Sequence, residues 1–185
     1  MVERTEAGGL CLQYLLSGDL AQILFPAPQA PAFTNGLWEH TCFELFVGVQ
    51  GESAYHEFNF SPSSQWAAYA FSGYREKVGG KSLPCPSFFT EGGLDPDSAN
   101  CYGVESSFLS CTRRSEGDFI LKTPIPVTDL PANPEHKPCE LGLTAVIETT
   151  TGEKSYWALQ HPLDRPDFHH RSGFVTGQTA SNGYF

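Results

Sequence analysis

The stretch that decides the fold is Thr41-Cys42-Phe43-Glu44-Leu45-Phe46-Val47-Gly48-Val49, in which apolar residues recur at every second position. On a β-strand, alternate side chains point to opposite faces. One face of this run would therefore carry Phe43, Leu45, Val47 and Val49, and the other Cys42, Glu44 and Phe46. The run Tyr55–Phe60 alternates in the same way, and its second face carries Tyr55, Glu57 and Asn59. Both runs predict β-strands.

Similar short runs occur on both sides of this pair. Leu10–Leu16 and Ala21–Phe25 are expected to form a hairpin through Ser17-Gly18-Asp19, and Trp66–Phe71 a strand with Tyr69 and Phe71 as its core pair. Further strands are expected at Tyr102–Cys111, Phe119–Ile125, Leu141–Glu148 and Ser155–Leu159, with long loops over 73–100. About nine short strands without a helical periodicity predict an all-β sandwich of two antiparallel sheets, built as one domain over residues 1–185.

Composition narrows the range of partners. The 185 residues include 18 Gly, 14 Pro, 14 Phe, 7 Tyr and 3 Trp, and the formal net charge is −10. Enough apolar and aromatic residues are present for a buried core, which excludes a disordered chain. The acidic balance argues against nucleic acid, whose phosphates need clustered Lys and Arg, and against an anionic membrane surface.

The start of the chain and its cysteines bear on location. No segment approaches the roughly 18 apolar residues of a membrane span, and the acidic start lacks the basic region and apolar run of a signal peptide. We therefore expect a cytoplasmic protein whose six cysteines are reduced and mostly buried. No C-x-x-C pair is present to suggest a zinc site.

No catalytic motif stands out. The sequence lacks G-x-G-x-x-G, G-x-S-x-G and H-E-x-x-H, and Gly79-Gly80-Lys81-Ser82 lacks the first glycine of a phosphate-binding loop. Glu44, Glu57 and Asp167 could supply a carboxylate pair for glycoside hydrolysis, which is the minority interpretation. We therefore predict a protein that is not an enzyme.

Three sequence blocks together resemble the bacterial DOMON-like domain proteins, relatives of the family 9 carbohydrate-binding modules. They are Gly36-Leu37-Trp38-Glu39-His40-Thr41-Cys42-Phe43-Glu44-Leu45-Phe46, the block from Tyr55-His56-Glu57-Phe58 to Tyr69, and Ser155-Tyr156-Trp157-Ala158-Leu159 followed by His161-Pro162 and 165–170. The first two blocks share with the modules a Trp before an acidic strand and a Tyr-x-Glu-Phe strand. The resemblance implies an immunoglobulin-like β-sandwich that binds a ligand, and its broader members bind sugars or haem.

A sugar site needs aromatic faces against the C–H side of the ring and polar side chains that pair with the hydroxyls. The three tryptophans are candidates for stacking: Trp38, Trp66 and Trp157. Candidates for hydrogen bonds are Glu57 and Asn59, which share a strand face, together with Arg75 and Asp167. His169 would orient the ligand or Asp167. Because tryptophans and polar strand faces also serve structure alone, the same residues could have no ligand.

The segment 161–170 concentrates His161, Asp164, Arg165, Asp167, His169 and His170. Such residues could bind a metal, but a loop fastened to the sandwich by Asp–backbone and Arg–Asp bonds is the preferred interpretation, so no metal site is predicted. Met–His ligation of haem is excluded because Met1 is the one methionine. Ligation by two histidines, His169 or His170 with His56 or His40, stays open without support, and no cofactor is predicted.

The sequence therefore predicts a non-catalytic domain that binds a small polar ligand, a carbohydrate or another polyol. Two alternatives remain. A structural or interaction protein without a ligand would keep Trp157, Arg165 and Asp167 interior and bonded to one another, with no concave polar pocket nearby. A haem- or metal-binding redox protein would show a metal content or a haem spectrum.

Overall fold

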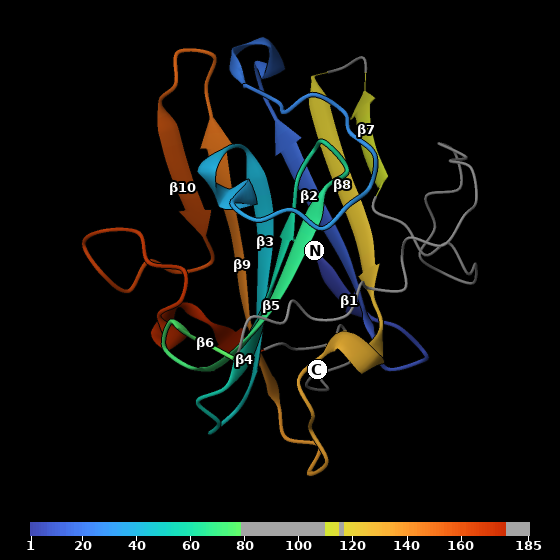
Figure 1. Ribbon diagram of the computed structural model, residues 1–185, viewed down its shortest axis with the longest axis vertical. Helices are drawn as coiled ribbons and strands as arrows, with labels where there is room; N and C mark the ends of the chain where they lie inside the picture. The colour runs from blue at the N-terminus through green and yellow to red at the C-terminus, as the bar shows by residue number, and fades with distance from the viewer. Residues whose placement is uncertain (79–109, 115–116, 177–185) are drawn as a thin grey trace.

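Two antiparallel sheets packed face to face make up the part of the chain that the computed structural model describes, which is residues 1–78, 110–114 and 117–176 (Figure 1). Within these ranges, helical structure is limited to 3₁₀ turns of three residues at Leu20–Gln22, Leu37–Glu39, Val127–Asp129 and Arg171–Gly173. The expected all-β sandwich of two antiparallel sheets is confirmed. The expectation of a single domain over 1–185 stays a prediction.

The smaller sheet has four strands in the order β1-β2-β8-β7. Their bounds are Val2–Arg4 (β1), Leu10–Ser17 (β2), Asp118–Ile125 (β8) and Ser110–Arg114 (β7). Eight consecutive residue pairs, from Leu10 with Ile125 to Ser17 with Asp118, join β2 to β8. This long central pair gives the small sheet its apolar inner face.

The larger sheet has seven strands, six of them in the order β10-β9-β3-β4-β5-β6. Their bounds are Lys154–Ala158 (β10), Cys139–Glu148 (β9), Cys42–Val49 (β3), Tyr55–Phe60 (β4), Trp66–Gly73 (β5) and Glu76–Lys77 (β6). The seventh, β11 (Val175–Thr176), pairs with the start of β9 beyond the end of β10. Strand β3, in which apolar residues alternate, lies near the middle of this sheet.

The core between the sheets contains the side chains that the period of two predicts for β3 and β4. Phe43, Leu45 and Val47 from β3 are buried against the small sheet. The ring of Phe43 stacks on Phe119 of β8, with centroids 5.6 Å apart. From the small sheet the same core receives Leu10, Leu12, Leu121 and Ile125. Burial of these side chains holds the two layers together.

Two details of the strand prediction are wrong. Ala21–Phe25 is not a strand: the side chain of Asp19 accepts a hydrogen bond from the backbone N of Ala21 (3.2 Å) and caps the turn Leu20–Gln22, so β2 pairs with β1 and β8 instead. Tyr69 and Phe71 belong to a second cluster on the outer face of the large sheet, while Trp66 and Ala68 occupy the core. Of the expected strand Tyr102–Cys111, all but Ser110 and Cys111 lies outside the described residues.

The structure describes four of the six cysteines, and Cys85 and Cys101 lie outside the described residues. Cys11 and Cys42 are buried as expected, whereas Cys111 and Cys139 are half-buried. Cys11 is disulfide-bonded, whereas Cys42, Cys111 and Cys139 carry free thiols. The expectation of reduced thiols is therefore wrong at Cys11. Disulfides persist mainly in oxidising compartments, and the cytoplasmic location stays a prediction.

The helical segments of the structure bear on whether the chain could cross a membrane. In the described ranges, no helix has the length and apolar character needed to cross a bilayer.

Shortening one buried and one exposed leucine side chain should have different effects on stability. Leu45 on β3 is fully buried and Leu15 on β2 is 57% exposed. We expect Leu45→Ala to lower the free energy of unfolding by about 2–5 kcal/mol, because it removes buried methyl groups and leaves a cavity. Leu15→Ala should change it by less than about 0.5 kcal/mol. Urea denaturation of both variants measures this, and equal losses would contradict the described core.

Candidate functional site

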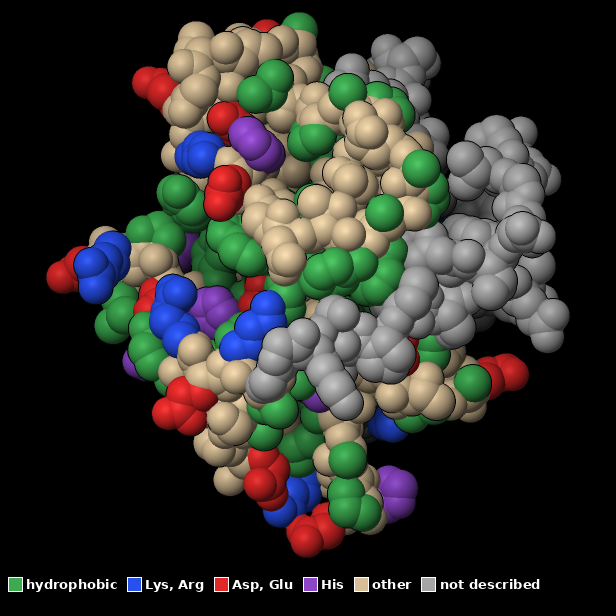
Figure 2. Space-filling model, in the orientation of Figure 1, with side chains coloured by type: hydrophobic (Ala, Val, Ile, Leu, Met, Phe, Trp, Pro, Cys, Tyr) green, Lys and Arg blue, Asp and Glu red, His purple; other side chains and the backbone are tan. Residues whose placement is uncertain are grey.

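The outer face of the large sheet, which points away from the small sheet, is hollowed into a cavity of about 530 Å³. Strands of the sheet supply its floor, with Glu44, Phe46, Glu57, Tyr69, Phe71 and Val146. The segment 166–169 and strand β10 form one wall, and Trp38, Arg75 and Lys77 stand at the rim. Figure 2 shows hydrophobic, basic and histidine side chains gathered around a hollow on this face.

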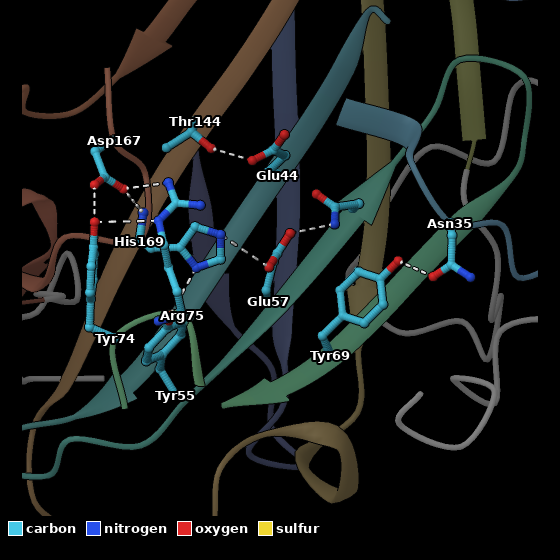
Figure 3. A network of polar contacts seen from close by, with 11 residues as sticks. Asn35, Glu44, Tyr55, Glu57, Tyr69, Tyr74, Arg75, Thr144, Asp167 and His169 are labelled. Carbon is cyan, nitrogen blue, oxygen red and sulfur yellow. Dashed lines mark hydrogen bonds and ion pairs between the residues drawn. The ribbon is translucent and has the colours of Figure 1, made fainter. Parts of the chain in front are cut away.

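Two carboxyl groups lie together on the floor. In the register of β3 and β4, Glu44 is opposite Asn59 and Phe46 is opposite Glu57, so the two glutamates are diagonal neighbours on one face. Both are buried, with 3% and 5% of their surface exposed. Glu44 Oε2 accepts a hydrogen bond from Thr144 Oγ1 of β9 (3.2 Å), and Glu57 Oε1 accepts one from Asn59 Nδ2 (2.7 Å) (Figure 3).

Burial makes both acids titrate near neutral pH. It raises the pKa of Glu44 to about 8, the charge of Glu57 raises it further, and the hydroxyl of Thr144 opposes the change. It also raises the pKa of Glu57 to about 7, against the hydrogen bond from Asn59 and the charges of Lys77 and Arg75. At pH 7 the floor can therefore both donate and accept hydrogen bonds. Strongly shifted acids inside a cavity are typical of functional sites.

One wall of the cavity is held by a network around Asp167. Its Oδ1 accepts hydrogen bonds from Arg75 Nη2 (2.9 Å) and from the backbone N of His169 (3.2 Å), and its Oδ2 accepts one from the hydroxyl of Tyr74 (Figure 3). Arg75 reaches this position from the turn between β5 and β6, where it has a positive φ of 57°. Partial burial acts to raise the pKa of Asp167, but Tyr74 and Arg75 hold it below the usual value.

His169 connects this network to the floor. Its Nδ1 lies 2.8 Å from the hydroxyl of Tyr55, and its Nε2 lies 3.8 Å from Oε2 of Glu57. The Tyr55 hydroxyl also accepts a hydrogen bond from the backbone N of Arg75 (3.1 Å). The tautomer of His169 decides whether Tyr55 donates to Nδ1 or accepts from it. Burial, together with the charge of Arg75, lowers the pKa of His169 to about 4. At neutral pH His169 is therefore uncharged and forms no ion pair with Glu57.

Aromatic rings form the other side of the cavity. Trp38 is 42% exposed and contacts Tyr69 edge to face, with ring centroids 6.0 Å apart. Tyr69 is fixed by a hydrogen bond from its hydroxyl to Asn35 Oδ1 (2.8 Å). The ammonium group of Lys77 lies 3.4 Å from the centroid of the same ring. The cavity thus offers one accessible indole beside a rigid phenol.

The structure brings together most of the predicted ligand residues. The cavity is lined by Trp38, Glu57, Arg75, Asp167 and His169. Asn59 is fully buried and holds the carboxyl of Glu57 through its hydrogen bond. These six come from β4, from the turns beside β3 and β5, and from the segment 166–169, so their proximity is a product of the fold.

Two tryptophans lie elsewhere, which corrects the predicted set. Trp66 is 3% exposed and packs in the core between the sheets, on the face of β5 opposite Tyr69. Trp157 is 62% exposed, while its neighbour Tyr156 on β10 lines the cavity. Alternation along a strand sends neighbouring side chains to opposite faces, which separates each tryptophan from the cavity. Neither Trp66 nor Trp157 can stack on a ligand held there.

Several lining residues were not among the predicted ligand-binding residues, although Glu44 was a candidate for the alternative carboxylate pair. Glu44, Tyr69, Lys77, Tyr156 and Phe168 all face the cavity. The sequence carried a signal for Glu44, because it alternates with the core residues of β3 as Glu57 does with those of β4. Tyr69 was assigned to the core because an apolar strand face normally faces inward. No local pattern identifies Lys77, which reaches the cavity from the short strand β6.

The segment 161–170 acts mainly as a fastened loop. His169 faces the cavity, and His170 instead contacts the hydroxyl of Ser172 through Nδ1 (2.7 Å). His161, Asp164 and Arg165 are exposed. Among the residues that the structure describes, no three His, Cys, Asp or Glu side chains group in a way that could hold a metal ion. The contacts of Asp167 are the Asp–backbone and Arg–Asp bonds expected of such a loop.

Comparison with known proteins found a similar fold among the solved structures. No family model matches the sequence, and no curated protein matches it significantly. A crystal structure of a proposed carbohydrate-binding protein from Bacteroides uniformis is similar in fold, with a TM-score of 0.54 and 14% sequence identity. The similarity covers 91% of this chain and 72% of the other. At this identity it establishes a shared β-sandwich architecture.

Removal of the Glu44 charge should change how stability depends on pH. The folded pKa of about 8 lies above the ordinary value of 4.5, so the folded chain holds this proton more tightly than the unfolded chain. Its stabilising contribution is complete below the unfolded pKa and is lost as pH rises through about 8. One pKa unit of difference corresponds to about 1.4 kcal/mol. We therefore expect Glu44→Gln to reduce the loss of stability between about pH 5 and about pH 9.

Urea denaturation across this pH range measures the effect. Glu153→Gln, a change of one exposed carboxyl in the β9–β10 turn, is the matched control and should follow the parent protein. If the Glu44→Gln and parent curves kept the same slope, the buried carboxyl would be ionised throughout and the described environment would be wrong.

Proposed function

We propose that this chain is a non-catalytic domain that binds a small polyhydroxylated ligand, a carbohydrate or another polyol, in the cavity on the outer face of the large sheet. The observation that carries the proposal is the placement of the accessible indole of Trp38 and the buried carboxyls of Glu44 and Glu57 around one open cavity. A flat ring covers the apolar face of a sugar, and carboxyl groups accept hydrogen bonds from its hydroxyls.

The proposed roles divide by position. Trp38 stacks on the ligand at the rim, Glu57 pairs with hydroxyls on the floor, and Arg75 donates from the side. Asn59 and Asp167 hold Glu57 and Arg75 through the hydrogen bonds already described. His169 is uncharged and keeps the segment 166–169 in place through its contact with the hydroxyl of Tyr55.

The similar fold supports the carbohydrate class. The Bacteroides uniformis protein is itself a proposed carbohydrate-binding protein, and the two chains share the sandwich over most of their length. The sequence blocks that resemble DOMON-like proteins include Trp38, Glu44 and Glu57, which meet at the cavity. We propose membership of that group on this combined ground.

A specific observation disfavours a purely structural role. That alternative requires Trp157, Arg165 and Asp167 to be interior and bonded to one another. Instead Trp157 and Arg165 are exposed, and Asp167 bonds Arg75 beside the cavity. The polar groups therefore surround an accessible space and do not fill the interior.

A matched pair of tryptophan variants tests the proposal. We expect a panel of neutral and amino monosaccharides and disaccharides to include at least one ligand that changes the tryptophan fluorescence of the parent protein. Trp38→Ala should weaken that ligand about tenfold or more, which is about 1.4 kcal/mol, because the stacking surface is lost. Trp157→Ala removes a more exposed indole outside the cavity and should leave the affinity unchanged.

Isothermal titration calorimetry with the same variants gives affinities without relying on fluorescence. The proposal fails if no member of the panel binds the parent protein. It fails equally if Trp157→Ala, and not Trp38→Ala, abolishes binding.

A further inference from the structure

The charges that line the cavity nearly compensate one another, with one acid left over. Asp167 forms an ion pair with Arg75 at 2.9 Å. The positive charge of Lys77 stabilises the ionised form of Glu57. At the exposed rim, Glu39 and Lys154 carry opposite charges. His169 is neutral at physiological pH. The remaining lining acid is Glu44 on strand β3, which has no basic partner among the described residues and stays protonated in the empty cavity at neutral pH.

Glu44 also has an oxygen that its surroundings do not use. Oε2 receives the hydroxyl of Thr144, whereas Oε1 is buried and has no hydrogen-bond partner among the described residues. A buried polar atom without a partner costs free energy unless something else supplies the hydrogen bond. Because Glu44 lines the cavity, a bound molecule can supply it.

The cavity already accommodates an ammonium group of the chain itself. Lys77 Nζ lies 3.4 Å from the centroid of the Tyr69 ring, well within the range of a cation–π contact. Tyr69 and Trp38 present neighbouring rings on the same side of the cavity. A second cation could therefore be received by aromatic surface on one side and by Glu44 below.

We infer that the ligand of this cavity carries a protonated amine, and that its ammonium group binds Oε1 of Glu44 while its hydroxyls pair with the groups around Glu57. This inference rests on the proposed function, because it names the class of polyol, an amino sugar or amino polyol. Glu44 becomes the residue that sets specificity.

A neutral hydroxyl would satisfy the same oxygen but would leave the charge balance unchanged. Two neighbouring buried carboxyls repel one another when both are ionised. In the empty cavity Glu44 avoids this repulsion by staying protonated at neutral pH. An ammonium ligand allows Glu44 to release that proton, because the carboxylate then forms a charge-assisted hydrogen bond, which is stronger than a neutral one. The difference between the two ligand types should therefore appear as a preference for the amine.

Calorimetric titration of the full chain at neutral pH tests this with four probes: glucosamine, glucose, N-acetylglucosamine and ethanolamine. Glucosamine differs from glucose by the amine, and N-acetylglucosamine keeps the nitrogen without its charge. We expect glucosamine to bind at least about tenfold more tightly than either neutral sugar. Equal affinities for glucosamine and glucose would overturn the inference and leave the proposed function standing.

Glu44→Gln separates the charge from the shape of the site. Glutamine is close to glutamate in size, so the variant should fold, and its preference for glucosamine should fall to within about threefold. Glu153→Gln, with the same change of charge outside the cavity, should keep the preference of the parent protein. If Glu44→Gln kept the preference for glucosamine, Glu44 would not be the residue that binds the ammonium group.

The remaining outcomes distinguish the two proposals. If ethanolamine binds in a Glu44-dependent way but no sugar does, the amine site is supported and the carbohydrate function is wrong. If none of the four probes binds, both the amine inference and its carbohydrate basis are contradicted for these ligands.

Discussion

Strand β3 is buried on both faces, and the carboxyl of Glu44 must be accommodated under that constraint. All eight residues of Cys42–Val49 are buried. One face packs against the small sheet, and the other is covered by the segment 166–174 and by rings from β4 and β5. Glu44 therefore has little access to water, keeps its proton to unusually high pH and offers a free oxygen to the cavity. The chemistry of the site follows from this burial.

The cover over the sheet depends on two glycines in neighbouring strands. A Cβ at Gly48 would lie 1.5 Å from Arg171 Nη1, so glycine there lets Arg171 lie across β3 and bond Glu140 and the carbonyl of Val49. At Gly142 a Cβ would approach the ring of Phe174 to 3.1 Å. These close contacts hold the segment that also carries Asp167 and His169. The wall of the cavity is thereby fixed to the same strands that form its floor.

The alternation in β3 and β4 was enough to predict the sandwich and to place Glu57 and Asn59 on one face. The site could be predicted only in part, because its walls come from Trp38, Arg75 and Asp167, which are distant in sequence. Trp66 shows why the prediction of cavity residues was incomplete. When both faces of a sheet are buried, both carry apolar residues, and the sequence does not say which face packs in the core between the sheets. The hairpin predicted at Ala21–Phe25 failed because the side chain of Asp19 caps a turn instead.

The central claim, that ligand enters the cavity on the outer face of the large sheet, is tested most directly by a ¹⁵N-correlation NMR titration with glucosamine. The three tryptophans give separate indole N–H signals from the rim of the cavity, from the core and from an exposed position on β10 outside the cavity. We expect the Trp38 indole signal to move with added ligand, together with amide signals of β3 and β4 near Glu44 and Glu57, while the Trp157 signal stays in place. Movement of the Trp157 signal with Trp38 unchanged would contradict the central claim.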